Sequence, residues 1–294
     1  MRKETAIALV PLAVSLLLGT SLMGQGLHLK GQLWGSVTAG NDPAPGHSDV
    51  EEVVGYIPIL SLARQPGPLS VIDLEYAYYL NAVLDGPFGN GEAGVDRYSR
   101  LYRLWGRIAT ERFELRLGLQ KIAFGPGRVL RPLMWFDTLD LRDPTGQTEG
   151  VGALRLKWYP WPKLALWGWV IRPDYQNYAS PGGRVGYTLG PAEFGLTYHR
   201  HKASELDFIG RQLLPFDNEE ERFAMDARLD WEIGFWTEAV LARGREPALD
   251  DKTDELAQLM IGGDYTFPWG NGVYVMVEHL WSRLDYYEPP PPWY

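Results

Sequence analysis

The chain has 294 residues, a formal net charge of -9 and a pI near 5.1, and 45% of its residues are hydrophobic. An acidic chain in which no basic stripe dominates any segment is unsuited to a nucleic-acid partner. The absence of cysteine excludes disulfide frameworks, thiolate zinc sites and a lipidated cysteine. The length accommodates one large all-β domain or two smaller domains.

The amino-terminal segment has the features of an export signal. A basic start, "MRK", precedes the apolar run "AIALVPLAVSLLLGTSLMG", and Gly24 and Gly26 are small residues ahead of Leu27. Residues 1–26 are therefore predicted to be a cleaved signal peptide, and residues 27–294 one outer-membrane domain. A retained membrane helix is the alternative, because the apolar run approaches the length that spans a bilayer.

Period-two alternation dominates the rest of the chain. In "ERFELRLGLQ", Leu115 and Leu117 share one parity and Glu114 and Arg116 the other, which places the two sets on opposite faces of a strand. Runs of this kind, bounded by turn residues, predict thirteen strands. Their ranges are 27–38, 53–64, 69–83, 97–109, 112–122, 151–159, 163–172, 183–189, 192–201, 221–231, 235–244, 257–267 and 272–283.

The connections between these strands alternate in length. The tight ones are 65–68, 110–111, 160–162, 190–191, 232–234 and 268–271, and the long ones are 39–52, 84–96, 123–150, 173–182, 202–220 and 245–256. Short turns at one end and long loops at the other are typical of outer-membrane barrels. The sequence therefore predicts an all-β fold, an antiparallel up-and-down transmembrane β-barrel of about 12–14 strands.

Lipid energetics assign the two faces of such a barrel. An Arg or Lys on the lipid face near the midplane costs about 2–4 kcal/mol, so charged side chains are predicted to face inward and apolar ones outward. The inward set is Asp73, Glu75, Arg103, Arg107, Glu114, Arg116, Arg155, Lys157, Asp226, Arg228, Asp230 and Asp264. The outward set is Ile72, Leu74, Leu104, Ile108, Leu115, Leu117, Leu154, Leu156, Leu166, Val170, Phe194, Leu196, Leu229, Leu259 and Ile261. Strand-end and turn aromatics, Trp158, Trp161, Trp231 and Trp269 among them, suit the interfacial girdles of a membrane barrel.

The longest connection, 123–150, is rich in Leu, Trp and Phe and carries several charges. A long loop of this composition is too apolar for disorder, so we expect it to fold into the mouth or lumen and to narrow it.

One segment resembles a known family. "GLQKIAFGPG", followed by "RPLMWFDTLDLRDPTGQTEGVGALRLKWYP", is similar to a segment of porin-like outer-membrane barrels, the alginate-export type among them. The resemblance covers about residues 108–159. Leu119 stands where that family has a basic residue, and Phe124 where it has tryptophan. The resemblance implies a β-barrel pore for small or polymeric solutes.

The candidate site is the pore lining. The predicted pore-lining residues are Arg103, Arg107, Glu114, Arg116, Arg128, Arg131, Asp137, Asp140, Arg142, Asp143 and Arg155. In one interpretation the bases form a ladder that draws anions through, as rings of charged side chains do in pores. In the other, acids and bases neutralise one another and pack the loop against the wall. The sequence leaves both open.

The predicted function is an outer-membrane channel for passive diffusion of small hydrophilic or anionic solutes. No cofactor and no metal are expected: His199 and His201 share a strand face, but a bare pair of histidines is a weak metal signal. No nucleophile-elbow, zincin or phosphate-loop motif indicates an enzyme. The expected partners are outer-membrane lipid and small solutes, with homo-oligomerisation left open. An exported soluble all-β carbohydrate-binding module is the alternative function.

The count of strands raises a question about closure. Bacterial single-chain barrels have an even number of strands, and both edges of the sheet need a partner. The ending "DYYEPPPPWY" cannot supply one, because Pro289 to Pro292 donate no backbone hydrogen bonds. Either the strand at 183–189 is false, or the chain lacks a closing carboxy-terminal strand.

Overall fold

The computed structural model describes residues 14–21, 26–39, 50–85, 94–137, 145–172, 179–202, 219–245 and 253–285. The chain divides into two units. Unit 1 comprises Met1–Gly106 and Leu139–Thr148, and unit 2 comprises Arg107–Thr138 and Glu149–Tyr294. Throughout the described ranges the regular structure is β-strand. No helix within them is long and apolar enough to cross a membrane.

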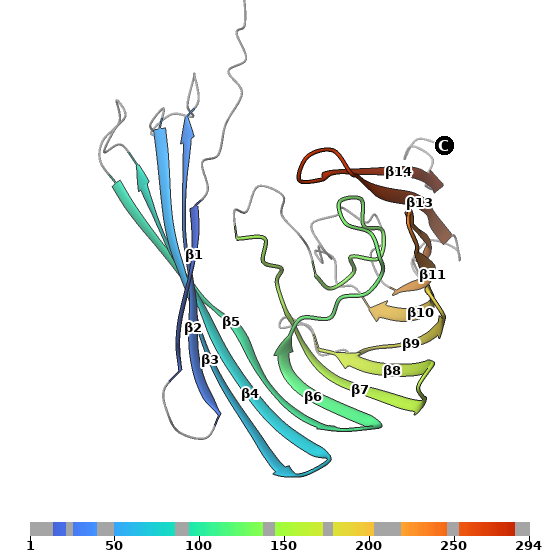
Figure 1. Ribbon diagram of the computed structural model, residues 1–294, viewed down its shortest axis with the longest axis horizontal. Helices are drawn as coiled ribbons and strands as arrows, with labels where there is room; N and C mark the ends of the chain where they lie inside the picture. Colours follow the sequence, from blue (N-terminus) through green and yellow to red (C-terminus); the bar gives the residue numbers. More distant parts are fainter. Residues whose placement is uncertain are drawn as a thin grey trace, which may run out of the picture. The chain divides into compact units, whose positions relative to one another are not determined.

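Unit 1 is a meander of long antiparallel strands. They are β1 (Val14–Ser21), β2 (Leu27–Ala39), β3 (Val50–Gly67), β4 (Ser70–Asp85) and the larger part of β5 (Gly94–Thr110). Each strand is hydrogen-bonded to the next one along the chain (Figure 1).

Unit 2 continues the same up-and-down pattern with shorter strands. They are β6 (Phe113–Gln120), β7 (Val151–Trp161), β8 (Leu164–Ile171), β9 (Ser180–Leu189), β10 (Ala192–Lys202), β11 (Glu219–Asp230), β12 (Gly234–Arg245), β13 (Thr253–Phe267) and β14 (Val273–Asp285). Sequence neighbours again pair antiparallel (Figure 1).

All thirteen predicted strands are present, as β2 to β14. The strand predicted at 183–189 is real and begins earlier, at Ser180. The additional strand is β1, which lies inside the predicted signal peptide and pairs with β2. β2 therefore has strand partners on both edges, whereas β14 pairs, within the described part of the chain, with β13 alone. Cleavage of the signal peptide and a missing closing strand stay predictions.

The predicted sorting of short and long connections is confirmed. The connections after the odd-numbered strands from β3 onward are short, at 68–69, 111–112, 162–163, 190–191, 231–233 and 268–272. Those after the even-numbered strands are longer, at 40–49, 86–93, 121–150, 172–179, 203–218 and 246–252. Glycines in left-handed conformation occupy two of the tight turns, at Gly190 (φ 58°) and Gly270 (φ 60°).

The two faces of the sheet have opposite character. Leu117 is 62% exposed and Leu196 61% exposed, and most of the predicted outward set is exposed in the same way. On the other face Arg103, Arg155 and Asp226 are buried. We call this second face the shielded face. Among the predicted inward set, Asp230 is the exception, because it ends β11 beside a turn and is exposed.

Each unit has its own buried cluster. In unit 1 it consists of Trp34, Ile57, Ala77, Tyr79 and Tyr102. In unit 2 it consists of Ile122, Phe124, Leu133, Trp135, Phe136, Ala153, Trp169, Ile171, Ala224 and Val240. The second cluster joins residues of the long connection to strand residues, so it shows where this connection packs.

Candidate functional site

The first part of the long connection, 121–137, lies against the shielded face of unit 2. Phe124 stacks on Trp169 of β8 with ring centroids 5.5 Å apart. Phe136 meets His199 of β10 edge to face at 4.8 Å. Burying these rings is favourable, because an aromatic side chain contributes both a large apolar area and a specific ring geometry. We call residues 121–137 the inner loop.

Glu238 of β12 holds the inner loop through its backbone. Its Oε1 accepts a hydrogen bond from the Gly127 N–H at 2.7 Å, and its Oε2 accepts one from the Leu133 N–H at 3.0 Å. The side chain is 1% exposed, so both bonds form away from water. Gly125 has φ +87°, and a Cβ at this position would collide with the Glu238 carboxylate. A glycine is therefore needed where the loop approaches the carboxylate.

Glu278 of β14 holds the next residues of the loop. Its carboxylate accepts the backbone N–H groups of Arg128 at 2.8 Å, Val129 at 2.9 Å and Leu130 at 2.7 Å. It also accepts the indole N–H of Trp236 at 2.9 Å. Successive N–H groups that converge in this way form an anion-binding concavity, which a wall carboxylate fills here.

Two further ion pairs fix the loop. The Arg131 guanidinium lies 2.6 Å from the Asp137 carboxylate, within the loop itself, and the Arg128 guanidinium lies 3.2 Å from Asp264 of β13. Burial raises the pKa of Asp137 above its usual value, and the Arg131 guanidinium opposes that shift without cancelling it. Asp137 belongs to the loop and not to a strand.

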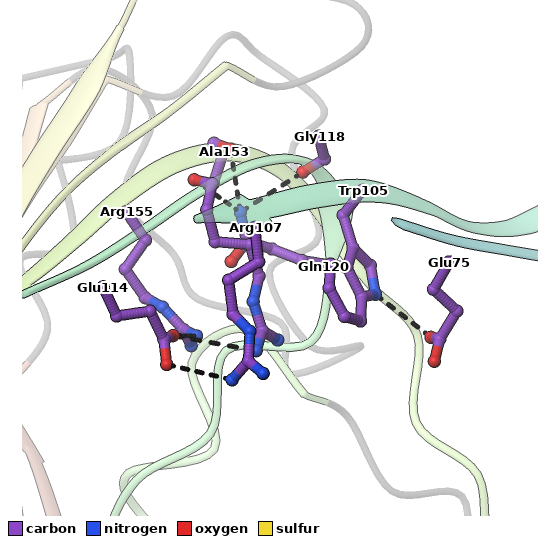
Figure 2. A network of polar contacts seen from close by, with 9 residues as sticks. Glu75, Trp105, Arg107, Glu114, Gly118, Gln120, Ala153 and Arg155 are labelled. Carbon is purple, nitrogen blue, oxygen red and sulfur yellow. Dashed lines mark hydrogen bonds and ion pairs between the residues drawn. The ribbon is translucent and has the colours of Figure 1, made fainter. Parts of the chain in front are cut away.

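Three arginines of β5, β6 and β7 surround one acid, and we call Arg107, Glu114, Arg116 and Arg155 the Glu114 cluster. Glu114 Oε1 accepts from the Arg155 guanidinium at 2.8 Å and lies 3.7 Å from that of Arg116. Its Oε2 accepts from Arg107 at 3.3 Å. Figure 2 shows Arg107 and Arg155 reaching the same carboxylate from two sides. One carboxylate thus serves three guanidinium groups.

Two ion pairs elsewhere on the shielded face of unit 2 join one base to one acid. Arg184 of β9 binds Asp226 of β11 through two bonds of 2.6 and 2.8 Å. Arg222 binds Glu220 on the same strand, at 2.5 and 2.9 Å. Bidentate pairs of this kind are strong, and their opposite charges nearly cancel. They therefore stabilise the fold but add little net charge to the shielded face.

The end of the long connection is held in unit 1. Arg103 donates to the Thr148 carbonyl, and the Tyr102 hydroxyl donates to the same oxygen at 2.8 Å. Gln32 donates to the Thr145 carbonyl at 3.2 Å. Arg103 is 6% exposed and its guanidinium lies over the Tyr102 ring, at 4.0 Å from the centroid. Its contacts are those of a residue that packs the loop end.

The predicted pore-lining residues therefore fall into groups. Arg107, Glu114, Arg116 and Arg155 come together in the Glu114 cluster, and Arg128, Arg131 and Asp137 belong to the inner loop and its contacts. Arg103 lies in unit 1. Asp140, Arg142 and Asp143 lie outside the described residues.

Sequence reasoning missed the role of Glu238 and Glu278. Each is a single acid at an inward position of an otherwise ordinary strand, so the alternation gave its face but not its partner. The two histidines that share a strand face are both buried, with His199 against Trp169 and His201 Nδ1 3.1 Å from Ser180 Oγ. Among the described residues no group of three or more His, Cys, Asp or Glu side chains could hold a metal ion.

Comparisons with known proteins identify the fold. No protein family and no curated protein matches the sequence. The solved structure of Salmonella typhi OmpF in complex with daunomycin aligns over 90% of this chain and 81% of that chain, with 14% identity and a TM-score of 0.52. That of Pseudomonas aeruginosa OccK7 covers 88% of this chain and 93% of that chain, with 12% identity and a TM-score of 0.28, too low to carry an argument. The chain thus has the all-β, antiparallel up-and-down fold of a transmembrane β-barrel.

Proposed function

We propose that the chain is an outer-membrane channel for passive diffusion of small hydrophilic or anionic solutes, reached by export and removal of residues 1–26. The proposal assigns three roles to the described parts. The exposed apolar face meets lipid, the shielded face lines water, and the long connection between β6 and β7 constricts the passage.

The observation that carries the proposal is the reversed polarity of the sheet. Large apolar side chains are exposed along strand after strand, Leu74, Leu104, Leu117, Leu154 and Leu196 among them, while charges occupy the shielded face. A water-soluble protein rarely exposes a contiguous apolar surface of this extent. In hydrocarbon the same surface is favourable, and the charges avoid a cost of about 2–4 kcal/mol each at the bilayer midplane.

The position of the inner loop supports the constriction. Carboxylates of β12 and β14 hold its backbone, and its aromatic residues cover part of the shielded face. A loop fixed at several points on the inner wall would narrow a pore without closing it by random motion. The unequal charge of the Glu114 cluster supports a preference for anions, because charged side chains that line a pore set its selectivity.

The alternative function, a soluble carbohydrate-binding module, predicts a different outer face. A soluble sandwich buries its apolar residues between two sheets and presents polar residues to water. Here Trp161 at the end of β7 and Trp231 and Trp269 in tight turns are 64 to 72% exposed, as interfacial anchors of a membrane barrel are. The exposed apolar face thus favours the channel.

The decisive experiment is reconstitution of the folded chain in planar bilayers and in liposomes. We expect ohmic single-channel conductance in chloride salts and swelling of liposomes in small sugars, amino acids and organic acids. Recovery of the folded chain from the soluble periplasm, with no conductance after reconstitution, would refute the proposal.

A matched pair of variants tests the lipid face separately. Leu117→Arg places a charge on the exposed face of β6 and should reduce assembly in vesicles by about 2–4 kcal/mol. Glu111→Arg changes an exposed residue of the adjoining tight turn and should assemble normally. Equal assembly of the two variants would contradict a lipid-facing Leu117.

A further inference from the structure

Lys157 lies beside the Glu114 cluster, and the acid expected to pair with it is bound by other side chains. Lys157 of β7 lies directly opposite Glu114 of β6 in the strand register. Directly opposed charges of opposite sign normally pair across antiparallel strands. Here the Glu114 carboxylate is instead engaged by Arg107, Arg116 and Arg155. The opposed pair is therefore not formed.

The ammonium of Lys157 turns to an aromatic ring. It lies 3.6 Å from the ring centroid of Trp167 on β8, and the Arg155 guanidinium lies 5.7 Å from the same centroid. A ring face attracts a cation but accepts none of its three N–H donors in the way an oxygen does. Within the described part of the chain, Lys157 has no hydrogen-bond or ion-pair acceptor.

The electrostatic surroundings of Lys157 are mostly positive. Among the described residues, the charged groups that act on it are Arg155, Arg116 and Arg107, with Glu114 as the single acid. Four cations thus share one carboxylate on partly shielded strand positions. Like charges held this close repel one another. An added anion would lower this repulsion and would also accept hydrogen bonds from the N–H groups of Lys157.

Space for a solute adjoins the site. A recess of about 370 Å³ is lined by Trp167, by Tyr159, which follows Lys157 on the same face of β7, and by Gly125 and Pro126 of the inner loop. This volume is within the range of small-molecule sites. A solute could therefore place an anionic group beside Lys157 and its body in the recess.

We propose that Lys157, with Arg155 and the ring of Trp167, forms a binding site for the oxyanion group, carboxylate or phosphate, of a small solute. The site is a resting point for the anionic solutes of the proposed channel and rests on that function. It makes anion passage saturable, which a wide neutral passage does not.

The first test reads Lys157 directly and needs no conduction. The folded chain in detergent micelles is treated with an amine-acylating reagent in phosphate, acetate or chloride at equal ionic strength, and acylation of each lysine is followed by peptide mass spectrometry. Bound oxyanion should slow acylation of Lys157 about tenfold when its concentration is about ten times its dissociation constant. Lys30, exposed on β2 and absent from the lining of the recess, should react equally in all three salts.

The three salts distinguish the possible ligands. Protection by phosphate alone assigns a phosphate site, and protection by acetate assigns a carboxylate site. Equal acylation of Lys157 in phosphate, acetate and chloride would overturn the proposal.

The second test uses conductance in planar bilayers. In the parent chain and in Lys30→Gln, current carried by the protecting anion should level off as its concentration rises, whereas in Lys157→Gln it should rise in proportion. Saturation that persists in Lys157→Gln would overturn the site while leaving the channel intact. Absence of conductance in every chain, with protection of Lys157 retained, would refute the channel and leave the site.

Discussion

Two regions on the shielded face of unit 2 use carboxylates in opposite ways. In the Glu114 cluster one carboxylate is surrounded by side-chain cations, which remain in excess. At the inner loop the carboxylates of Glu238 and Glu278 accept backbone N–H groups, which carry no formal charge. In the proposed channel, the first arrangement would set the charge that a solute meets. The second sets where the loop lies.

The largest expected effect comes from removing the buried member of the second region. Glu238→Ala leaves the N–H groups of Gly127 and Leu133 without an acceptor, at about 1–3 kcal/mol each. The loop should then open more often, which tryptic cleavage after Arg128 in the folded protein measures. Single-channel current should become larger or noisier. Glu114→Ala is the matched control, and faster cleavage in that variant would abolish the distinction between the two regions.

A smaller effect of the same kind is expected at Gly125. Gly125→Ala forces a Cβ into a left-handed backbone position, at about 1–2 kcal/mol, and pushes against the Glu238 carboxylate. Tryptic cleavage of the inner loop should accelerate, less than in Glu238→Ala. Gly146→Ala is the control, since this glycine also has a positive φ but nothing within 4 Å of its would-be Cβ. Equal acceleration of cleavage in Gly125→Ala and Gly146→Ala would show that backbone strain explains the effect without a collision with Glu238.

Glu114→Gln tests the other region. Removing the one acid should increase the excess of cations and move the reversal potential further toward anion selectivity. The change should be clear at low salt and small at 1 M, where the Debye length is about 3 Å. Tryptic cleavage of the inner loop should stay at the parental rate. A reversal potential that does not move would mean that the cluster lies away from the ion path.

The smallest effect concerns Asp137 and pH. Burial raises the pKa of this carboxyl in the folded loop, so its protonated form is favoured there. Its stabilising contribution is then complete below the usual Asp pKa and is lost as pH rises through the raised pKa. Protection of the loop from an acid-tolerant protease should decline over that window. In Asp137→Asn this decline in protection should be absent. A variant with the same pH profile as the parent chain would show that another group causes the decline.

The strands and their faces could be predicted because both depend on local information. The alternation of Leu115 and Leu117 with Glu114 and Arg116 is visible in a few residues, and the cost of charge in lipid decides which parity faces outward. The placement of Arg155 and Asp226 opposite the exposed apolar face followed from the same rule, and both are buried.

The contacts within the site could not be predicted, because they depend on register and on distant partners. That Lys157 lies opposite Glu114 follows only from how β6 and β7 align. That Glu238 accepts the N–H of Gly127 joins residues 111 positions apart, and a backbone donor leaves no mark in the sequence. β1 was missed because its residues also fit an export signal.

The distance along the chain between the inner loop and its acceptors has a consequence for the order of assembly. The loop is complete before β7, yet Glu238 and Glu278 belong to β12 and β14, with separations of 105 to 150 residues. Contacts so far apart in sequence form late, since the entropy of closing the intervening chain must be overcome first. The proposed passage would therefore be wide while the sheet grows and would narrow when β14 joins it. A substitution that disrupts β14 would then change the position of the inner loop, although this loop lies near the middle of the chain.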